Sequence, residues 1–130
     1  MRRLLLVEDH TKELLSAAAV AESLGFGDVD ACQSVHKAMR SLEKGMSGEG
    51  PLPDAIVLDL DLGVESGYEL LRYWRGTPAL SRIPVMIWSV VEEQRDVCEL
   101  FRVKSFVSKW EGMGAFRKAL SELIPSVLAG

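Results

Sequence analysis

The sequence predicts an α/β fold built on a parallel β-sheet. Short apolar runs such as Leu4–Val7 and Ala55–Leu58 alternate with longer stretches in which apolar residues recur at helical spacing. Apolar runs of this length, bounded by turn residues, are typical of strands that are buried on both faces. Strands that alternate with helices are typical of a parallel sheet with helical crossovers, so we expect a single α/β domain.

The first half of the chain is predicted to contain three strands and two helices. The strands are expected at about residues 3–7, 28–32 and 55–59. The first helix is expected over residues 11–24, because its apolar residues fall on one face and Gly25 provides a C-terminal stop. The second helix is expected to start near Ser34. The Gly- and Pro-rich stretch 45–53 then predicts an elongated loop within the same domain.

The second half of the chain is predicted to alternate in the same way. A helix is expected to begin at Ser66, whose spacing from Glu69 matches a capping box. Further strands are expected at about residues 84–88 and 105–108, and helices at about 92–102 and from Met113 to a stop at Pro125. The residues of helix 92–102 that are expected to face the core are Val97, Leu100 and Phe101.

Length and composition fit one globular domain over residues 1–130. The chain is 48% hydrophobic and 26% charged, and its net charge of −4 gives no basic surface for nucleic acid. The sequence shows neither a secretory signal nor an apolar stretch long enough to span a membrane, so we expect a cytoplasmic protein. Cys32 and Cys98 both lie in apolar patterns, which favours buried thiols over a disulfide.

Polar side chains follow four of the predicted strands at the points where the strands end. They are Glu8, Asp9, Asp59, Ser89 and Lys109. Because the ligand crevice of an open parallel sheet lies outside the carboxyl ends of its strands, we expect these side chains to converge. Carboxylates held close together favour a hard cation such as Mg²⁺. One carboxylate can then accept a phosphoryl group, which a metal, a lysine and a hydroxyl group would stabilise.

Four stretches of the sequence resemble the response-regulator receiver domain of two-component signalling. They are Leu4–Asp9, Pro53–Asp59, Ile83–Ser89 and Ser105–Lys109. Their order and spacing extend the resemblance over nearly the whole chain. The resemblance implies a flavodoxin-like, doubly wound fold with five parallel strands in the order 2-1-3-4-5, flanked by five helices. It also implies a phosphorelay in which a sensor histidine kinase or a histidine phosphotransfer protein donates phosphate.

The resemblance assigns roles to the acidic residues. Asp59 corresponds to the phospho-accepting aspartate, since it closes the apolar run. Glu8 and Asp9 correspond to the acidic pair that, with Asp59, binds Mg²⁺, with Mn²⁺ as a second option. The Asp61 position is expected to contribute its main-chain carbonyl to the metal. We interpret His10 as a residue of the helix entry rather than as a metal ligand.

The resemblance also implies a switch. Ser89 and Lys109 correspond to the hydroxyl and the lysine that contact the phosphoryl group. Phe106 occupies the place of a rotating aromatic switch residue, although plain core packing explains it equally well. A downstream protein whose identity is unknown would bind the face formed by the fourth helix, the fifth strand and the fifth helix. A homodimer is a further option.

The sequence departs from the family pattern beside the site. Trp110 follows Lys109 where the family usually has a proline in a cis peptide, and we predict a trans bond because a non-proline cis bond costs about 2.5–4 kcal/mol. Val90 stands where a small residue is usual, and with Val91 and Trp110 it is expected to modulate phosphoryl access. Gly63 replaces a proline after the nucleophile. None of these changes removes an acid, the hydroxyl or the lysine.

Two alternatives stay open from the sequence. Val90, Trp110 and Gly63 could belong to a pseudo-receiver that serves as a docking or dimerisation module without phosphorylation. The pair Asp59 and Asp61 also resembles the first motif of haloacid-dehalogenase-type phosphatases, but those need a downstream acidic pair, whereas the pair here is upstream. We favour a signalling receiver that catalyses only its own phosphorylation and dephosphorylation and is not a conventional enzyme.

Overall fold

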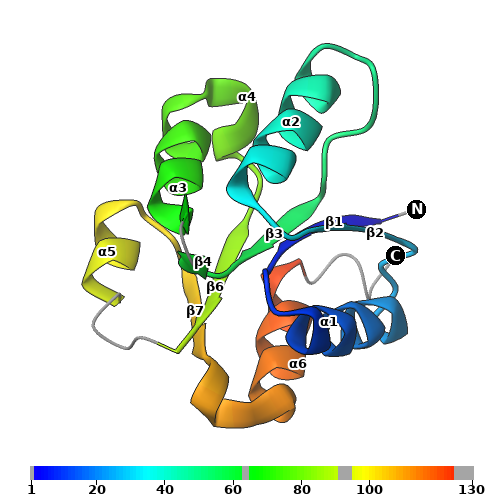
Figure 1. Ribbon diagram of the computed structural model, residues 1–130, viewed down its shortest axis with the longest axis vertical. Coiled ribbons are helices and arrows are strands. Elements are labelled where there is room, and N and C mark those ends of the chain that lie inside the picture. The colour runs from blue at the N-terminus through cyan, green and yellow to red at the C-terminus, as the bar shows by residue number, and fades with distance from the viewer. Residues whose placement is uncertain (1, 63–64, 91–94, 125–130) are drawn as a thin grey trace.

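Five strands form one parallel sheet in a computed structural model that describes residues 2–62, 65–90 and 95–124 (Figure 1). The strands are β1 (Arg3–Val7), β2 (Asp28–Cys32), β3 (Ala55–Leu58), β6 (Val85–Ser89) and β7 (Ser105–Ser108). Their order across the sheet is β2-β1-β3-β6-β7, and every neighbouring pair is parallel. Because β6 and β7 are the fourth and fifth strands of this sheet along the chain, the predicted order 2-1-3-4-5 is confirmed.

Helices cover both faces of the sheet. They are α1 (Thr11–Ser23), α2 (Val35–Met46), α3 (Gly67–Gly76), α4 (Pro78–Ser81), α5 (Arg95–Leu100) and α6 (Gly112–Leu123). In Figure 1, α1 and α6 lie on one face of the sheet, whereas α2, α3 and α5 lie on the other. The described part of the chain therefore has three layers, with helices outside and the sheet between them.

Each face of the sheet supplies one hydrophobic core, and β1 shows how. Leu4 and Leu6 pack into the core beneath α1 and α6, which also contains Phe116. Leu5 and Val7 pack into the core beneath α2 and α3. Successive side chains of a strand point to opposite faces, so a strand covered on both sides needs a continuous apolar run. This is the pattern from which the strands were predicted.

Helix ends follow the local sequence. The Ser34 hydroxyl accepts a hydrogen bond from the Lys37 N–H at 3.1 Å, as expected for an N-cap. The Ser66 hydroxyl accepts one from the Tyr68 N–H at 3.2 Å at the start of α3, so Ser66 is the N-cap as expected, although its donor is Tyr68 and not the Glu69 N–H that a capping box would use. Gly25 has a φ of 99° directly after the end of α1, which confirms its role as the stop.

The structure contains short elements that the sequence did not predict. A two-stranded antiparallel hairpin, β4 (Asp61–Leu62) with β5 (Glu65–Ser66), follows the sheet strand β3. The single turn α4 begins at Pro78, a residue favoured at the first position of a helix. A 3₁₀ helix, η2 (Lys109–Glu111), follows β7. Elements this short cannot show a periodic pattern of apolar residues. The sequence therefore predicted five helices, whereas the described residues contain more.

Helix α5 differs from its prediction in length and in the residues it buries. Its described part is shorter than the expected 92–102, and residues 91–94, the Val97 side chain and Pro125 lie outside the described residues. Leu100 is 77% exposed, whereas Cys98 is buried, so the expected inward placement of Leu100 is wrong. The spacing of the large apolar residues did not predict which face of this helix points inward. The inner face carries the buried thiol of Cys98, and cysteine packs like a small apolar residue.

The end of α5 is a Schellman-type cap formed without glycine. The Val103 N–H donates to the Cys98 carbonyl at 2.8 Å, and Arg102 lies between them with a φ of 59°. A left-handed backbone at a residue with a Cβ carries strain, and glycine is the usual residue here. Val103 and Lys104, and no glycine, lie between Arg102 and β7.

Two predictions about the whole chain can be compared with the structure. Cys32 and Cys98 are both free and buried, as the sequence indicated. Among the described residues, no helix has the length and apolar character that a bilayer span requires.

Candidate functional site

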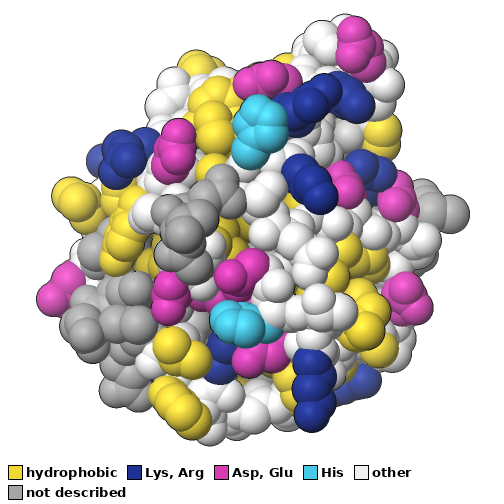
Figure 2. All heavy atoms as spheres, viewed as in Figure 1, with side chains coloured by type: hydrophobic (Ala, Val, Ile, Leu, Met, Phe, Trp, Pro, Cys, Tyr) yellow, Lys and Arg dark blue, Asp and Glu magenta, His cyan; other side chains and the backbone are white. Residues whose placement is uncertain are grey.

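The ends of β1 and β3 bring carboxylates together at one edge of the sheet. Val7 pairs with Leu58, so Glu8 and Asp59 leave neighbouring strands at the same level. The Asp59 N–H donates to the Val7 carbonyl at 3.1 Å, and the Glu8 N–H donates to the Cys32 carbonyl at 3.0 Å. Both side chains are buried. Figure 2 shows acidic side chains gathered around a histidine on this face of the molecule.

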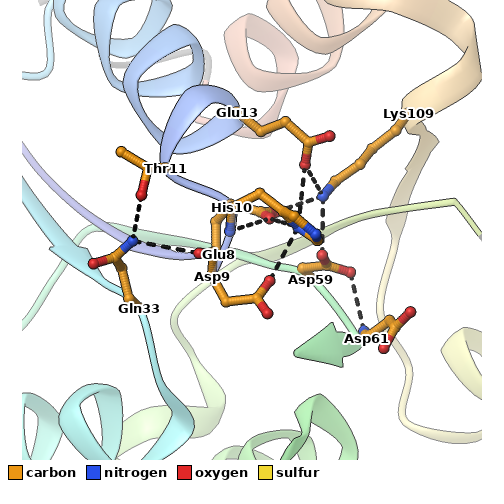
Figure 3. A network of polar contacts seen from close by, with 9 residues as sticks. All are labelled: Glu8, Asp9, His10, Thr11, Glu13, Gln33, Asp59, Asp61 and Lys109. Atoms are coloured by element: carbon orange, nitrogen blue, oxygen red, sulfur yellow. Dashed lines mark hydrogen bonds and ion pairs between the residues drawn. The ribbon is translucent and has the colours of Figure 1, made fainter. Parts of the chain in front are cut away.

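Lys109 enters this cluster from the far end of the sequence, directly after β7 (Figure 3). Its Nζ lies 2.6 Å from Glu8 Oε2, 2.5 Å from Glu13 Oε2 and 2.9 Å from Asp59 Oδ2. Its side chain is 8% exposed. Burial by itself lowers the pKa of Lys109, but the hydrogen bonds to the three carboxylates outweigh burial and raise this pKa above its ordinary value. Lys109 is therefore a fixed positive charge in the site.

The Glu8 carboxyl shows that the cluster has too few cations. Burial raises the pKa of Glu8 to about 7, the hydrogen bond from Lys109 offsets part of this rise, and the charge of Asp59 adds to it. A second acid beside a buried acid favours the protonated form of the pair, and added positive charge favours the carboxylates. A divalent cation would supply that charge, so the electrostatics of the cluster favour a metal.

The donor atoms of the cluster suit a hard divalent metal ion. Glu8, Asp9, His10 and Asp59 each offer one ligand atom, and these atoms all lie within 4.8 Å of one another. Asp9 Oδ1 is buried and accepts no hydrogen bond from the described residues, although it lies 3.1 Å from His10 Nδ1. Carboxylate oxygens suit Mg²⁺ and Mn²⁺. The residues therefore fit the metal that the family resemblance implied.

His10 lies at the start of α1, as expected for a helix-entry residue. It takes the N-cap position, and its ring is exposed. Its Nδ1 lies 3.0 Å from Glu8 Oε1, and this contact raises the pKa of His10. The ring is thus an outer neighbour of the acidic cluster.

The Asp59 carboxylate is held at both oxygens. Lys109 donates to Oδ2, and the Asp61 backbone N–H donates to Oδ1 at 3.0 Å. The Asp61 side chain is exposed. The start of helix α3 packs closely against the loop after Asp59. A Cβ added to Gly67 would lie only 2.6 Å from the Asp59 carbonyl oxygen. Only a glycine allows this approach without a backbone shift.

Ser89 is the last residue of β6, the strand that pairs with β3. Its side chain is fully buried, and its hydroxyl has no hydrogen-bond partner within the described structure. A buried hydroxyl without a partner is costly, which favours a site that is completed by another polar group. Val90, the next residue, is 39% exposed, whereas Val91 lies outside the described residues.

The segment after Lys109 takes the predicted trans form. Among the described residues no peptide bond is cis, and Lys109–Glu111 forms η2. A capping box closes this turn: the Ser108 hydroxyl accepts from the Trp110 N–H at 3.2 Å, and the Glu111 carboxylate accepts from the Ser108 N–H at 2.8 Å. The Trp110 side chain is 80% exposed.

Phe106 lies within β7 and is half-buried against the core beneath α2 and α3. The Arg95 guanidinium carbon lies 5.1 Å from the centre of its ring. Core packing, one of the two explanations offered from the sequence, thus explains the buried part of the Phe106 ring. Gly63 lies outside the described residues.

Sequence reasoning missed two contributors to the site. Glu13, in the first turn of α1, contacts Lys109 as closely as the strand-end acids do. Its only sequence signal was helical spacing, four residues after Asp9 at the start of a helix. Gln33 donates through Nε2 to the Asp9 carbonyl at 3.3 Å and to the Thr11 hydroxyl at 3.1 Å, which ties the loop after β2 to the acidic loop.

The fold and the site together define a class of protein. A doubly wound parallel sheet with an acidic cluster, a lysine and a buried hydroxyl at its carboxyl edge is the arrangement of receiver domains. The chain belongs to the response regulator receiver domain family, whose sequence model matches residues 4–121. A comparison with curated protein sequences finds no match.

Solved structures agree with this assignment. The bacteriophytochrome response regulator AtBRR is 26% identical, with a TM-score of 0.75 over 95% of this chain and 92% of that one. The Mn²⁺-bound form of response regulator Rcp1 is 25% identical, with a TM-score of 0.75 over 99% and 91%. The chemotaxis response regulator CheY4 of Vibrio cholerae, 16% identical over 95% and 99%, has a TM-score of 0.81 and supports the fold alone.

Proposed function

We propose that the chain is the phospho-accepting receiver of a two-component phosphorelay, with Asp59 as the acceptor. One observation carries this proposal. The buried Asp59 carboxylate accepts a hydrogen bond from Lys109 at 2.9 Å, and the neighbouring strand ends in the buried Ser89 hydroxyl, which has no hydrogen-bond partner among the described residues. A nucleophile flanked by a fixed cation and a free hydroxyl suits phosphoryl transfer.

The chemistry follows from these three residues. An Asp59 carboxylate oxygen attacks the phosphorus of a phosphohistidine, the P–N bond breaks, and the imidazole leaves with the electron pair. The product is an aspartyl phosphate. Lys109 and Ser89 donate hydrogen bonds to the phosphoryl oxygens, whose charge is greatest in the transition state. Water later attacks the same phosphorus, the bond between phosphorus and the Asp59 oxygen breaks, and inorganic phosphate leaves as the carboxylate is restored. The receiver therefore catalyses only its own modification and is not a conventional enzyme.

A divalent metal belongs to this function. Glu8, Asp9 and Asp59 would hold Mg²⁺ or Mn²⁺ with the main-chain carbonyl of Asp61. When bound, the metal neutralises charge between the acidic cluster and the incoming phosphoryl group. Support comes from the donor set, from the Mn²⁺-bound form of Rcp1, and from the phosphorylated cyanobacterial phytochrome response regulator RcpA, which is 26% identical with a TM-score of 0.74 over 98% and 89% of the two chains.

Partners follow from the chemistry. The phosphoryl donor is a sensor histidine kinase or a histidine phosphotransfer protein. Phosphorylation shifts Ser89 and Phe106 toward the phosphoryl group and so biases an existing two-state equilibrium. The face formed by α5, β7 and α6 would then bind a downstream protein or a second copy of the chain. Binding of beryllofluoride, a phosphoryl analogue, should shift amide signals of residues 92–120, and unchanged signals would contradict the switch.

Intact-mass measurement tests the acceptor. The protein is incubated with acetyl phosphate, with and without Mg²⁺, beside the variants Asp59→Asn and Asp61→Asn. We expect one phosphate adduct in the wild type and in Asp61→Asn, only with Mg²⁺, and none in Asp59→Asn. A wild type that forms no adduct would favour the pseudo-receiver alternative, to which the departures at Val90 and Trp110 point. Family membership leaves the phosphatase alternative without support.

A further inference from the structure

Lys109 has more carboxylate partners than phosphoryl transfer requires. Its ammonium group has three N–H donors, and Glu8, Glu13 and Asp59 each accept one of them (Figure 3). In this arrangement no donor is left for a phosphoryl oxygen. A phosphoryl group on Asp59 can therefore reach Lys109 only if an existing acceptor gives way.

Glu13 is the acceptor that can leave with the least loss. Its side chain is 42% exposed, whereas those of Glu8 and Asp59 are 0% and 3% exposed. A half-exposed carboxylate regains water when it breaks an ion pair, whereas a buried carboxylate has no access to water that could replace Lys109. His10 Nδ1, 3.6 Å from Glu13 Oε2, offers the released carboxylate a second partner.

The surroundings of Lys109 leave space for this exchange. Glu13, Lys109 and Trp88 line a hollow of about 310 Å³ beside the acidic cluster. The Lys109 Nζ lies 4.9 Å from the centre of the Trp88 ring, a cation–π contact that helps to hold the ammonium group in place. Glu13 can thus swing into the hollow while Lys109 stays in place.

We propose that Glu13 is a positioning residue that holds Lys109 in the unphosphorylated protein and gives way when the phosphoryl group arrives. This inference rests on the proposed function and adds regulation to it. The exchange opposes phosphorylation, because the Lys109–Glu13 ion pair must break before Lys109 can stabilise the transferred oxygens. Loss of the pair should therefore speed transfer to Asp59.

Initial rates of adduct formation test the proposal. Wild type, Glu13→Gln and Glu13→Asp are compared with acetyl phosphate and Mg²⁺, beside Glu22→Gln, an exposed acid on the same helix. We expect both Glu13 variants to react faster than the wild type, by up to about fivefold. This is the change in rate that corresponds to the loss of one partly exposed ion pair. Glu13→Asp keeps the negative charge but is one methylene shorter. It therefore distinguishes the effect of losing the contact with Lys109 from the effect of losing the charge. Glu22→Gln should match the wild type.

The form of the rate change distinguishes positioning from a change in local charge or stability. Because Lys109 acts in the chemical step, the maximal rate should rise while the half-saturating acetyl phosphate concentration stays constant. Glu13 variants that are no faster, or a Glu13→Asp that matches the wild type, would overturn the proposal. A wild type without any adduct would overturn the proposed function first, whereas a wild-type adduct with unchanged variant rates would overturn this inference alone.

Discussion

Lys109 is the residue on which the electrostatics of the site depend. Replacing it by methionine keeps its length but leaves Glu8 and Asp59 buried without a cation. We predict that Lys109→Met lowers the free energy of unfolding by about 3 kcal/mol in the presence of a chelator. Mg²⁺ should recover more stability in this variant than in the wild type. Urea denaturation with and without Mg²⁺ measures both effects, and Lys12→Met serves as an exposed control.

An equal response to Mg²⁺ in the wild type and in Lys109→Met would contradict this account. It would mean that the metal does not bind the carboxylates that contact Lys109. The lysine and the metal would then act at separate places, against the contacts of Glu8 and Asp59.

The two cysteines give a prediction about reactivity. Burial raises the pKa of the Cys32 thiol to about 12 and that of the Cys98 thiol to about 11, and Asp30 adds to the rise at Cys32. Only the thiolate reacts with alkylating reagents, and at pH 8 both groups are neutral in the folded protein. Iodoacetamide should therefore modify neither residue until urea unfolds the chain. Rapid modification of the native protein, detected by mass, would show that these thiols are accessible.

At the scale of single residues, the sequence predicted those site members that end a strand. Glu8, Asp59 and Lys109 could be predicted because the edge of a parallel sheet gathers strand ends regardless of how the helices pack. Glu13 could not be predicted in the same way. Its position beside Lys109 depends on the angle at which α1 packs on the sheet, which the hydrophobic pattern of α1 does not fix.

At the scale of elements, the end of α5 stores strain that one substitution can release. Arg102 has a φ of 59°, where a Cβ is unfavourable. Arg102→Gly should raise the free energy of unfolding by about 0.5–1 kcal/mol, since relief of strain exceeds the extra entropy of an unfolded glycine. Arg102→Ala keeps the Cβ and should bring no such gain. A gain in both variants, measured by urea denaturation, would assign the effect to the arginine side chain.

Helix α3 offers a matched pair of glycine substitutions. A Cβ on Gly67 would lie 2.6 Å from the Asp59 carbonyl oxygen and 2.8 Å from Leu60 Cα, whereas nothing lies within 4 Å of a Cβ on Gly76. Gly67→Ala should cost about 2 kcal/mol of stability and slow phosphorylation of Asp59, because the backbone of the loop must move. Gly76→Ala should be neutral or stabilise by up to about 1 kcal/mol. Equal effects of the two changes would contradict the close packing of α3 on this loop.

The predicted residue ranges were most accurate for elements whose local sequence pattern agrees with their packing in the fold. The strand β1 matches its expected range, because burial on both faces demands an uninterrupted apolar run. The edge strands β2 and β7 also match their ranges, although both are only partly buried and include polar residues. The hairpin β4–β5 and the turn α4 are too short to carry a period. The described part of α5 buries Cys98 instead of Leu100, a rotation about the helix axis that breaks no local rule.

At the scale of the molecule, charge is arranged along the direction of the strands. The acidic cluster lies at the carboxyl ends of the strands. At the opposite end a hollow of about 620 Å³ is lined by Arg75, Arg82 and Arg102, which lie at or just after the C-terminal ends of α3, α4 and α5. Cations at these ends complement the helix dipoles. The net charge of −4 thus includes a group of arginines at the end of the sheet opposite to the acidic cluster.

The identity of the phosphorylated residue is the central claim, and reductive trapping tests it most directly. Sodium borohydride reduces an aspartyl phosphate to homoserine, so the protein is treated with acetyl phosphate and Mg²⁺, reduced and mapped by tandem mass spectrometry. We predict homoserine at position 59 and nowhere else. Reduction at Asp61, Glu8 or Asp9 instead, or a phosphate adduct that leaves Asp59 unreduced, would contradict the account.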